Sequence, residues 1–349
     1  MSMRIDRSPV FASATEAKAK QTAQLGDLPV WTLDHLYPGQ TSAEFLGAVD
    51  KAAAEALSFE TKWKGKLEAA LQTMGNDSLA NALTELDALE DLLGRIASYA
   101  GLTYYSDMTN PANGKFFGDI QAKLTDMSAR LLFFPLEMNR LSDDAVDAAM
   151  DRDPALGHFR PWIVDLRKDK PFQLDDRIEQ LFLEKSQTGA AAFNRLFDET
   201  LASLRFKVGD EEMPLEPTLT LLQDADPAKR KLAAEALSKT FKDNIRIFTL
   251  VTNTLAKDKD ISDRWRGFED IADSRHLANR VEREVVDALA EAVREAYPRL
   301  SHRYYKMKAK WLGMDQMNFW DRNAPLAETP DRLIPWDEAK DMVLSAYGG

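Results

Sequence analysis

The 349-residue sequence has no cysteine and only four histidines. The absence of cysteine excludes disulfide bonds and thiolate metal sites, and it fits a reducing compartment. None of His35, His158, His276 and His302 has a second histidine three or four residues away. No helix can therefore present the paired histidines of a helical zinc site. We expect ordinary packing or surface roles for all four, and no metal site built wholly within this chain.

Long apolar runs and blocks of positive charge are also missing. No run is long enough to span a bilayer, and residues 1–20 lack the apolar centre of a signal peptide. The formal net charge of -12 favours solubility and argues against a surface that follows nucleic-acid phosphates. We therefore expect a cytoplasmic protein with neither a membrane nor a nucleic acid as its partner.

The motifs of common catalytic sites are absent as well. The sequence contains no G-x-S-x-G, no S-x-x-K and no glycine-rich phosphate loop. Asp258, Asp260 and Asp263 faintly resemble a calcium-binding loop, but Asp263 occupies the sixth position, where such a loop requires glycine. A second acidic cluster has the spacing of a solvated helix face and comprises Asp143, Asp144, Asp147, Asp151 and Asp153. We interpret both clusters as surface charge.

Helical periodicity covers most of the chain. Apolar residues recur three and four positions apart in two clear stripes: Phe45, Val49, Ala52 and Ala56, and then Leu79, Leu83, Leu86, Leu89 and Leu93. Residues 113–133, 176–201 and 336–347 have the same pattern. Pro135 should end or kink its helix, because proline lacks an amide hydrogen. Asp226 and Pro227 form a typical helix start, and two helices should then reach about Ala256.

The longest helical signal runs from Asn279 to Gly313. Asn279 and Glu282 can form a capping box at its start, Pro298 should kink it, and Gly313 should end it. A β-hairpin is predicted over residues 204–215, where Leu204, Phe206 and Val208 alternate with polar residues and a Gly-Asp turn follows. A weaker alternation of apolar and polar residues suggests a further strand within residues 317–328. The fold class is therefore mainly α with a small β-hairpin.

Three aromatic residues near the end of this region have two possible roles. Trp311, Phe319 and Trp320 could line a substrate groove. Packing in a core is the commoner role of such residues, and we favour it on the residues alone.

Several segments, taken together, resemble the oligoendopeptidase F branch of the thimet-oligopeptidase-like zinc metallopeptidases. Their order and spacing make the match specific, and it extends over nearly all of residues 28–349. The matching segments are Trp31-Thr32-Leu33-Asp34-His35-Leu36-Tyr37-Pro38, Phe206-Lys207-Val208-Gly209, Lys229-Arg230-Lys231-Leu232-Ala233, Asn253-Thr254-Leu255-Ala256-Lys257-Asp258, Arg264-Trp265-Arg266-Gly267-Phe268, Tyr304-Tyr305-Lys306-Met307-Lys308-Ala309-Lys310-Trp311-Leu312-Gly313 and Trp320-Asp321-Arg322-Asn323-Ala324-Pro325-Leu326.

The resemblance implies a helical two-lobed scaffold with a channel for short unfolded peptides. In that family two histidines of H-E-x-x-H and a downstream glutamate bind zinc, and the glutamate of the motif activates the zinc-bound water. No position of this sequence matches H-E-x-x-H. We therefore assign no catalytic residue and no metal ligand, and the substrate-binding residues stay unknown.

The expected organisation is a mobile tail (1–27), an N-terminal helical lobe (28–203) and an incomplete first part of the catalytic domain (204–349), truncated before the zinc-binding helix. We expect the N-terminal portion of a zinc oligoendopeptidase, inert as it stands and without zinc of its own. It should associate with itself or with a missing C-terminal fragment, and residues 205–349 should be the less stable part. The alternative is a non-catalytic helical peptide-binding or interaction protein.

Overall fold

The computed structural model describes residues 25–326 and 333–348. The predicted tail over residues 1–27 lies almost wholly outside this part. The chain divides into two compact units, one formed by Leu33–Ala324 and the other by Met1–Thr32 with Pro325–Gly349. The expected boundary between residues 203 and 204 falls inside the first of these units, and it stays a prediction.

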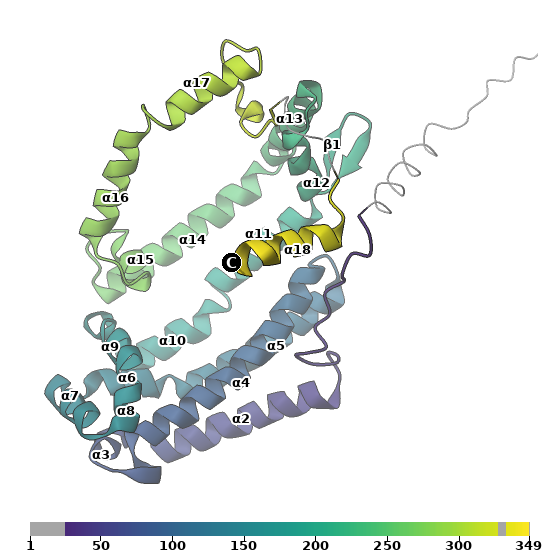
Figure 1. Ribbon diagram of the computed structural model, residues 1–349. Helices are drawn as coiled ribbons and strands as arrows, with labels where there is room; N and C mark the ends of the chain where they lie inside the picture. The colour runs from purple at the N-terminus through teal and green to yellow at the C-terminus, as the bar shows by residue number, and fades with distance from the viewer. Residues whose placement is uncertain (1–24, 327–332, 349) are drawn as a thin grey trace, which may run out of the picture. The chain divides into compact units, whose positions relative to one another are not determined.

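Helices dominate the described residues, as the sequence predicts, and Figure 1 shows their arrangement. In the Leu33–Ala324 unit they are α2 (Ala43–Trp63), α3 (Leu67–Leu71), α4 (Leu79–Ser106), α5 (Pro111–Leu131), α6 (Phe133–Arg140), α7 (Asp143–Arg152), α8 (Pro154–His158), α9 (Arg160–Arg167), α10 (Asp176–Ser186), α11 (Ala190–Ser203), α12 (Leu215–Thr220), α13 (Pro227–Asp243), α14 (Ile245–Arg266), α15 (Asp273–Ala278), α16 (Arg283–Ala296) and α17 (Ser301–Trp311). Short 3-10 helices are η1 (Gly75–Asp77), η2 (Lys170–Phe172), η3 (Leu221–Gln223) and η4 (Phe319–Asp321).

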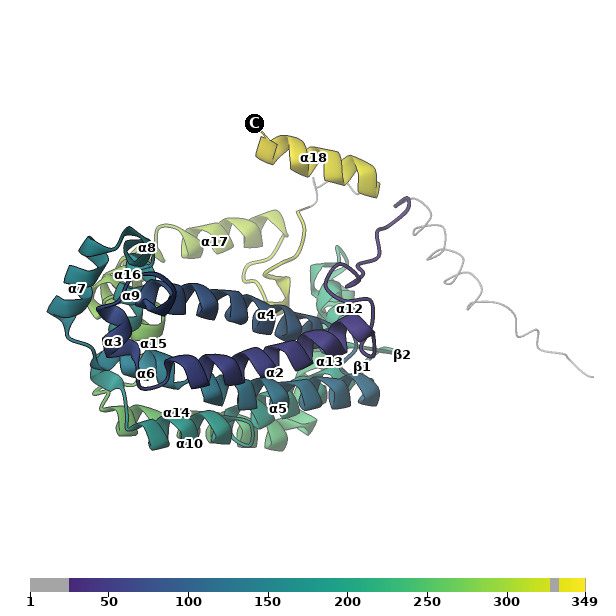
Figure 2. The same cartoon turned by 90° about the horizontal axis from the view of Figure 1, so that it is seen from below.

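Helices α2, α4 and α5 form the best-packed part of this unit. Figures 1 and 2 show them side by side, and all three pairs are in contact. The predicted stripes meet between them: Phe45, Ala56 and Leu83 are buried in one cluster. Each large apolar side chain buried in this way contributes about 1.5–3 kcal/mol. The two predicted stripes therefore supply the main core.

Two predicted helices are interrupted where the backbone requires it. Helix α5 ends at Leu131, and Pro135 lies in the first turn of α6, where a missing amide hydrogen costs no helical bond. Residues 176–201 are largely helical, as their pattern predicts, but they form two helices: α10 ends at Ser186 and α11 begins at Ala190. Gly189 lies at this break, where an added Cβ would be 3.2 Å from the Lys185 carbonyl oxygen, a tight contact.

The predicted hairpin is confirmed. Strands β1 (Phe206–Val208) and β2 (Glu211–Met213) pair antiparallel, with Phe206 opposite Met213. Gly209 makes the turn with φ 63°, a backbone conformation that costs glycine little. Phe206 is fully buried against α13, in a small second cluster with Leu204 and Leu237.

The two helices predicted after the hairpin are present, but the second of them, α14, ends later than expected. Asp226 caps α13 by accepting a hydrogen bond from the Ala228 amide at 2.8 Å. Helix α14 continues ten residues beyond the predicted end at Ala256, to Arg266. It ends where Gly267 adopts φ 79° and the Phe268 amide donates to the Asp263 carbonyl oxygen at 3.0 Å. The signal that ends the helix is therefore this glycine.

The long signal from Asn279 to Gly313 forms two helices, α16 and α17. The expected capping box at Asn279 is wrong: Asn279 ends α15, Arg280 adopts φ 52°, and Glu282 is the residue before α16. The interruption at Pro298 is confirmed, because α16 ends at Ala296 and α17 begins at Ser301. Gly313 follows α17 with φ 70°, as expected of a helix stop.

The second predicted strand is also wrong within the described residues. Phe319–Asp321 is the 3-10 helix η4, and residues 327–328 lie outside the described part. Asp321 Oδ2 accepts hydrogen bonds from the Asn318 amide at 3.2 Å and from Asn318 Nδ2 at 3.1 Å. These two bonds close the turn and prevent the alternation that a strand requires.

The second unit is described at residues 25–32, 325–326 and 333–348. Its helix α18 (Trp336–Gly348) agrees with the predicted helix over residues 336–347. The Trp336 amide donates to the Leu25 carbonyl oxygen at 2.8 Å, which joins the two segments of this unit. No helix among the described residues has both the length and the apolar character that crossing a membrane requires.

Candidate functional site

An aromatic cavity beside α17 and η4 is the first candidate site, and we call it the aromatic hollow. Its volume is about 790 Å³. Its aromatic side chains come from two segments that the sequence places 14–15 residues apart, so the turn after Gly313 brings them together. The lining residues are Leu222, His302, Tyr305, Lys306, Ala309, Asp315, Gln316, Met317, Asn318, Phe319, Trp320, Arg322 and Asn323.

The three aromatic residues considered from the sequence do not form a core. Phe319 is 70% exposed and Trp311 is 52% exposed, so the expected core packing is wrong for both. Phe319 and Trp320 line the aromatic hollow, with ring centroids 4.9 Å apart in an edge-to-face arrangement. Trp311 does not line it and instead contacts Tyr304.

A buried ion pair holds η4 beside α13. Asp321 Oδ1 accepts hydrogen bonds from Arg230 Nε at 3.1 Å and Nη2 at 2.8 Å, and both residues are almost fully buried. Arg230 Nη1 also donates to the carbonyl oxygens of Asp224 and Ala225, at 2.8 and 2.9 Å. The guanidinium is thus well satisfied, as a buried charge must be.

A second buried cation completes this support. Lys308 Nζ donates to the Arg322 carbonyl oxygen at 2.7 Å and joins α17 to the turn after η4. Burial and the nearby Arg230 charge lower the pKa of Lys308. Burial alone would raise the pKa of Asp321, but hydrogen bonds from Arg230 and Asn318 outweigh it and the pKa is lowered. These three charged residues fix the backbone that carries Phe319 and Trp320.

No individual role for Arg230, Lys308 or Asp321 could be predicted from the sequence. Each lies in a segment that carries the family resemblance, but alternating charges on a helix usually indicate a solvated face. The spacing of Asn318 and Asp321 is a capping-box signal that could have located η4. The pairing of Arg230 with Asp321 spans 91 residues and has no local signature.

A second cavity, of about 750 Å³, lies among α6, η2, α10, α14 and α15, and we call it the amide hollow. An ion pair forms part of its wall: Arg266 Nη1 and Nη2 donate to Glu179 Oε1 and Oε2 at 2.7 and 2.8 Å. Arg266 Nη1 also donates to the Phe172 carbonyl oxygen at 3.1 Å, and Phe172 stacks on Phe268 with ring centroids 4.1 Å apart. The segment from Arg264 to Phe268 thus docks α14 onto η2 and α10.

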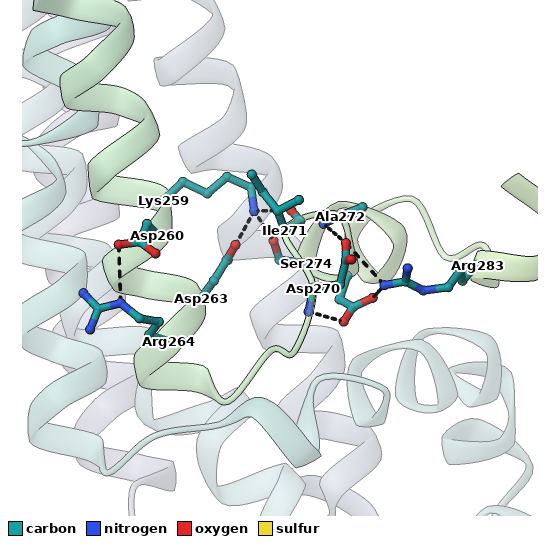
Figure 3. Close-up of polar contacts among 10 residues, drawn as sticks. Lys259, Asp260, Asp263, Arg264, Asp270, Ile271, Ala272, Ser274 and Arg283 are labelled. Atoms are coloured by element: carbon teal, nitrogen blue, oxygen red, sulfur yellow. Dashed lines mark hydrogen bonds and ion pairs between the residues drawn. The ribbon is translucent and has the colours of Figure 1, made fainter. Parts of the chain in front are cut away.

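Figure 3 shows how the acidic cluster of α14 is used. Lys259 Nζ donates to Asp263, to the Ile271 carbonyl oxygen and to Ser274 Oγ, the last two at 2.8 Å. Asp260 pairs with Arg264 on the same helix. These carboxylates lie on a regular helix and bind cationic side chains. The interpretation as surface charge agrees with Asp260, which is exposed, but not with Asp263, whose side chain is only 13% exposed. Arg283 pairs in the same way with Asp270 and Asp273.

The residues present do not fit a zinc ion. Within residues 25–326 and 333–348, no three His, Cys, Asp or Glu side chains lie close enough together to hold a metal. The four histidines lie apart in the fold: His35 precedes α2, His158 ends α8, His276 lies in α15 and His302 in α17. We therefore derive no catalytic step through zinc for this chain.

The buried carboxylates predict a specific loss of stability in acid. The pKa values of Asp321 and Glu179 are both lowered. For Glu179, burial alone would raise the pKa, but hydrogen bonds from Arg266 and the Leu174 amide outweigh it. A carboxyl group with a lowered pKa stabilises the fold fully above its unfolded pKa, about 4, and loses this effect as the pH falls through the folded pKa. Urea midpoints should therefore fall steeply from pH 4.5 towards pH 2.

An Arg230→Met/Asp321→Leu variant is the matched control for this acid effect. It lacks the buried Asp321 carboxyl group, whose pKa is lowered, so its urea midpoint should change less over the same pH interval. Parallel losses in the wild-type protein and the variant would show that Asp321 does not contribute.

A family model and two curated relatives all match this chain to oligopeptidases. The family described as Oligopeptidase F matches residues 137–206. Oligopeptidase PepF of Bacillus subtilis is 24% identical over 345 residues, which are 95% of this chain and 49% of that protein. Group B oligopeptidase PepB of Streptococcus agalactiae is 25% identical over 273 residues, which are 76% of this chain and 45% of that protein. The chain thus spans about half the length of these relatives.

A solved structure has the same fold. The crystal structure of oligoendopeptidase-F from Enterococcus faecium superposes with a TM-score of 0.71 at 20% identity, over 81% of this chain and 56% of that one. The fold class predicted from the sequence, mainly α with one hairpin, is confirmed by this likeness and by the described helices. The resemblance to the oligoendopeptidase F family that the sequence indicates is confirmed by these matches, which cover about half the length of each relative.

Proposed function

We propose that this chain is the N-terminal portion of a zinc-dependent oligopeptidase and that the aromatic hollow contacts the peptide. The observation that carries the proposal is the position of Phe319 and Trp320, exposed or half-buried at a cavity of about 790 Å³. Cavities that combine aromatic surface with a few polar groups are typical ligand sites. The names of the relatives, which are oligopeptidases, supply the ligand class.

The lining of the hollow suits an unfolded peptide. The rings of Tyr305, Phe319 and Trp320 can cover apolar side chains. The amides of Asn318 and Asn323 can donate to peptide carbonyl oxygens and accept from peptide amides. A folded protein offers few free backbone groups, because its amides and carbonyls are already paired. Short unfolded peptides therefore fit this surface best.

Hydrolysis is not assigned to this chain. In the proposed enzyme the zinc ligands and the general base belong to residues outside it, so the chain alone should be inert. The alternative, a peptide-binding or interaction protein without catalysis, uses the same hollow. An in-frame H-E-x-x-H beyond codon 349 would favour the peptidase, and a natural stop codon there would favour the alternative. A cytoplasmic location stays a prediction.

The exposed apolar face of α16 is a candidate surface for a further partner. Val285, Leu289, Val293 and Tyr297 recur at helical spacing, and all four side chains are exposed. Exposed apolar surface of this kind marks an interaction site. We propose that the C-terminal portion found in the longer relatives covers this face, and that isolated chains associate through it.

The peptide site can be tested by binding. Replacing Phe319 by Ala should weaken binding of a fluorescent unstructured peptide about threefold to tenfold, since an aromatic contact contributes roughly 0.5–1.5 kcal/mol. Trp311→Ala is the matched control, because Trp311 is exposed but lies outside the hollow. Fluorescence anisotropy measures both.

Equal affinity of the Phe319→Ala and wild-type proteins would contradict the peptide site. The same samples test inertness, since neither should cleave a quenched fluorescent peptide. Chelator-sensitive cleavage by a pure sample carrying about one zinc per chain would show that the assignment of catalysis to other residues is wrong.

A further inference from the structure

One face of α17 forms a wall of the aromatic hollow. His302, Tyr305, Lys306 and Ala309 all line the cavity, and each is three or four residues from the next or directly beside it in the sequence. Residues at these spacings lie on the same side of an α-helix. Most of the other lining residues belong to the segment 315–323. The hollow therefore lies between a helix face and the segment that follows that helix.

Two cationic side chains line this hollow without a partner. Lys306 and Arg322 are both exposed, and neither side chain forms an ion pair or a hydrogen bond within residues 25–326 and 333–348. Arg322 contributes only its carbonyl oxygen, which accepts from Lys308. The neighbouring cations Arg230 and Lys308 differ from this pair, because both are buried and engaged by groups of the protein. Lys306 and Arg322 are thus free to meet a ligand.

The charge of the lining is opposite in sign to that of the chain. Asp315 is the acidic residue of the lining, so the cations outnumber it by two to one when histidine is taken as neutral. The whole chain has a formal net charge of -12. Lys306 and Arg322 need not touch each other to favour an anion in the cavity, since a charge acts over a Debye length of about 8–10 Å at ordinary salt.

The apolar part of the lining determines what the anion should be attached to. Tyr305, Met317, Phe319 and Trp320 line the cavity together with Leu222. Aromatic rings and a methionine side chain favour a large apolar side chain, and methionine adapts to its shape. The anionic groups of an unmodified peptide are carboxylates, at its C-terminus and on Asp and Glu side chains. A carboxylate close to a large apolar side chain therefore complements this surface.

We propose that the aromatic hollow prefers peptides in which a carboxylate lies beside a large apolar residue, and that Lys306 and Arg322 determine this preference. The inference rests on the proposed peptide site and names the peptides that this site binds best. The rings cover the apolar side chain, while the two cations attract the carboxylate. A guanidinium group matches the planar carboxylate, and an ammonium group acts as a point charge. The C-terminus and an acidic side chain present the same chemical group.

Calorimetric titration with three tetrapeptides tests this preference. The probes are acetyl-Ala-Ala-Ala-Phe as the free acid, the same peptide as its C-terminal amide, and acetyl-Ala-Ala-Glu-Phe amide. At least one of the two anionic peptides should bind about tenfold more tightly than the neutral amide, roughly threefold for each exposed cation. The one that gains shows whether the carboxylate comes from the C-terminus or from a side chain. Raising the salt concentration should reduce the difference.

Substitutions of the two cations identify the cause. Lys306→Met and Arg322→Met should each reduce the preference about threefold and leave binding of the neutral amide unchanged. Both side chains are exposed and unpaired within the described residues, so the fold should be preserved. Lys306→Arg should keep the preference, because the charge is retained. Lys310→Met is the matched control: Lys310 is exposed on the same helix but lies outside the hollow.

Two outcomes would contradict the inference in different ways. Equal affinity for the three peptides, or a preference that Lys306→Met and Lys310→Met reduce equally, would overturn the carboxylate preference. The peptide site would still stand if Phe319→Ala weakened binding of the neutral amide. Absence of binding by all three peptides would overturn the peptide site itself, and the preference with it.

Discussion

Replacing Arg230 by Met should lower the free energy of unfolding by about 3–5 kcal/mol, the usual cost of removing one partner of a buried ion pair. The variant leaves Asp321, which is fully buried, without the two guanidinium hydrogen bonds. It also frees the carbonyl oxygens of Asp224 and Ala225. Urea unfolding followed by circular dichroism measures the loss.

The Arg230→Met/Asp321→Leu variant tests the physical reason for this loss. Removing both charges also removes the desolvation penalty, so the double variant should recover much of the stability that the single variant loses. Lys239→Met is the control, because its ion pair with Asp243 is exposed and should contribute less than about 1 kcal/mol. A loss below 1 kcal/mol for Arg230→Met would contradict the central role of this pair.

The ion pair of Arg230 and Asp321 illustrates why some parts of the fold can be predicted from the sequence and others cannot. The stripe from Phe45 to Ala56 and the alternation around Phe206 are local patterns, and both elements form as predicted. The partners Arg230 and Asp321 lie on different elements, far apart in sequence, and each alone resembles an ordinary surface charge.

The misplaced helix boundaries have a related cause. The break at Gly189 and the late start of α16 coincide with local backbone features: a close approach to the Lys185 carbonyl oxygen, and φ 52° at Arg280. Apolar periodicity continues through both places and contains no information about them. A positive φ at arginine is uncommon, and here Arg280 is held by ion pairs with Asp165 and Asp169. Those contacts exist only in the folded chain.

The candidate sites could be predicted from the sequence only in part, because some of their residues carry a local signal and others do not. Phe319 and Trp320 stand out as aromatic residues in a short segment, and a groove was one of their two predicted roles. The amide hollow gave no signal, because Asn139 and Gln173, which line it, are unremarkable until the fold buries their side-chain oxygens without partners. Burial of a polar group is a property of tertiary packing, so only the structure could identify it.

The last prediction concerns the unequal stability of the Leu33–Ala324 unit. Its large core is formed by residues between Tyr37 and Ile163, whereas the buried cluster around Phe206 has only four members. Helix α16 has no buried residue, and Leu289, at 65% exposure, lies on its apolar face. Helices with few buried contacts open at low free-energy cost, while core helices open only with the whole unit.

Hydrogen exchange on a monomeric sample should show this difference directly. Amides of α16 should exchange at least about 100-fold faster than those of α4, which corresponds to roughly 2.7 kcal/mol of opening free energy. The end of α17 should be better protected than α16, because Lys308 and Ala309 are buried. Raising the protein concentration or adding a C-terminal fragment of a longer relative should slow exchange in α16, since covering its apolar face stabilises it. Protection across residues 281–311 as strong as in α4 on the monomer would contradict the prediction and favour a complete, non-catalytic domain.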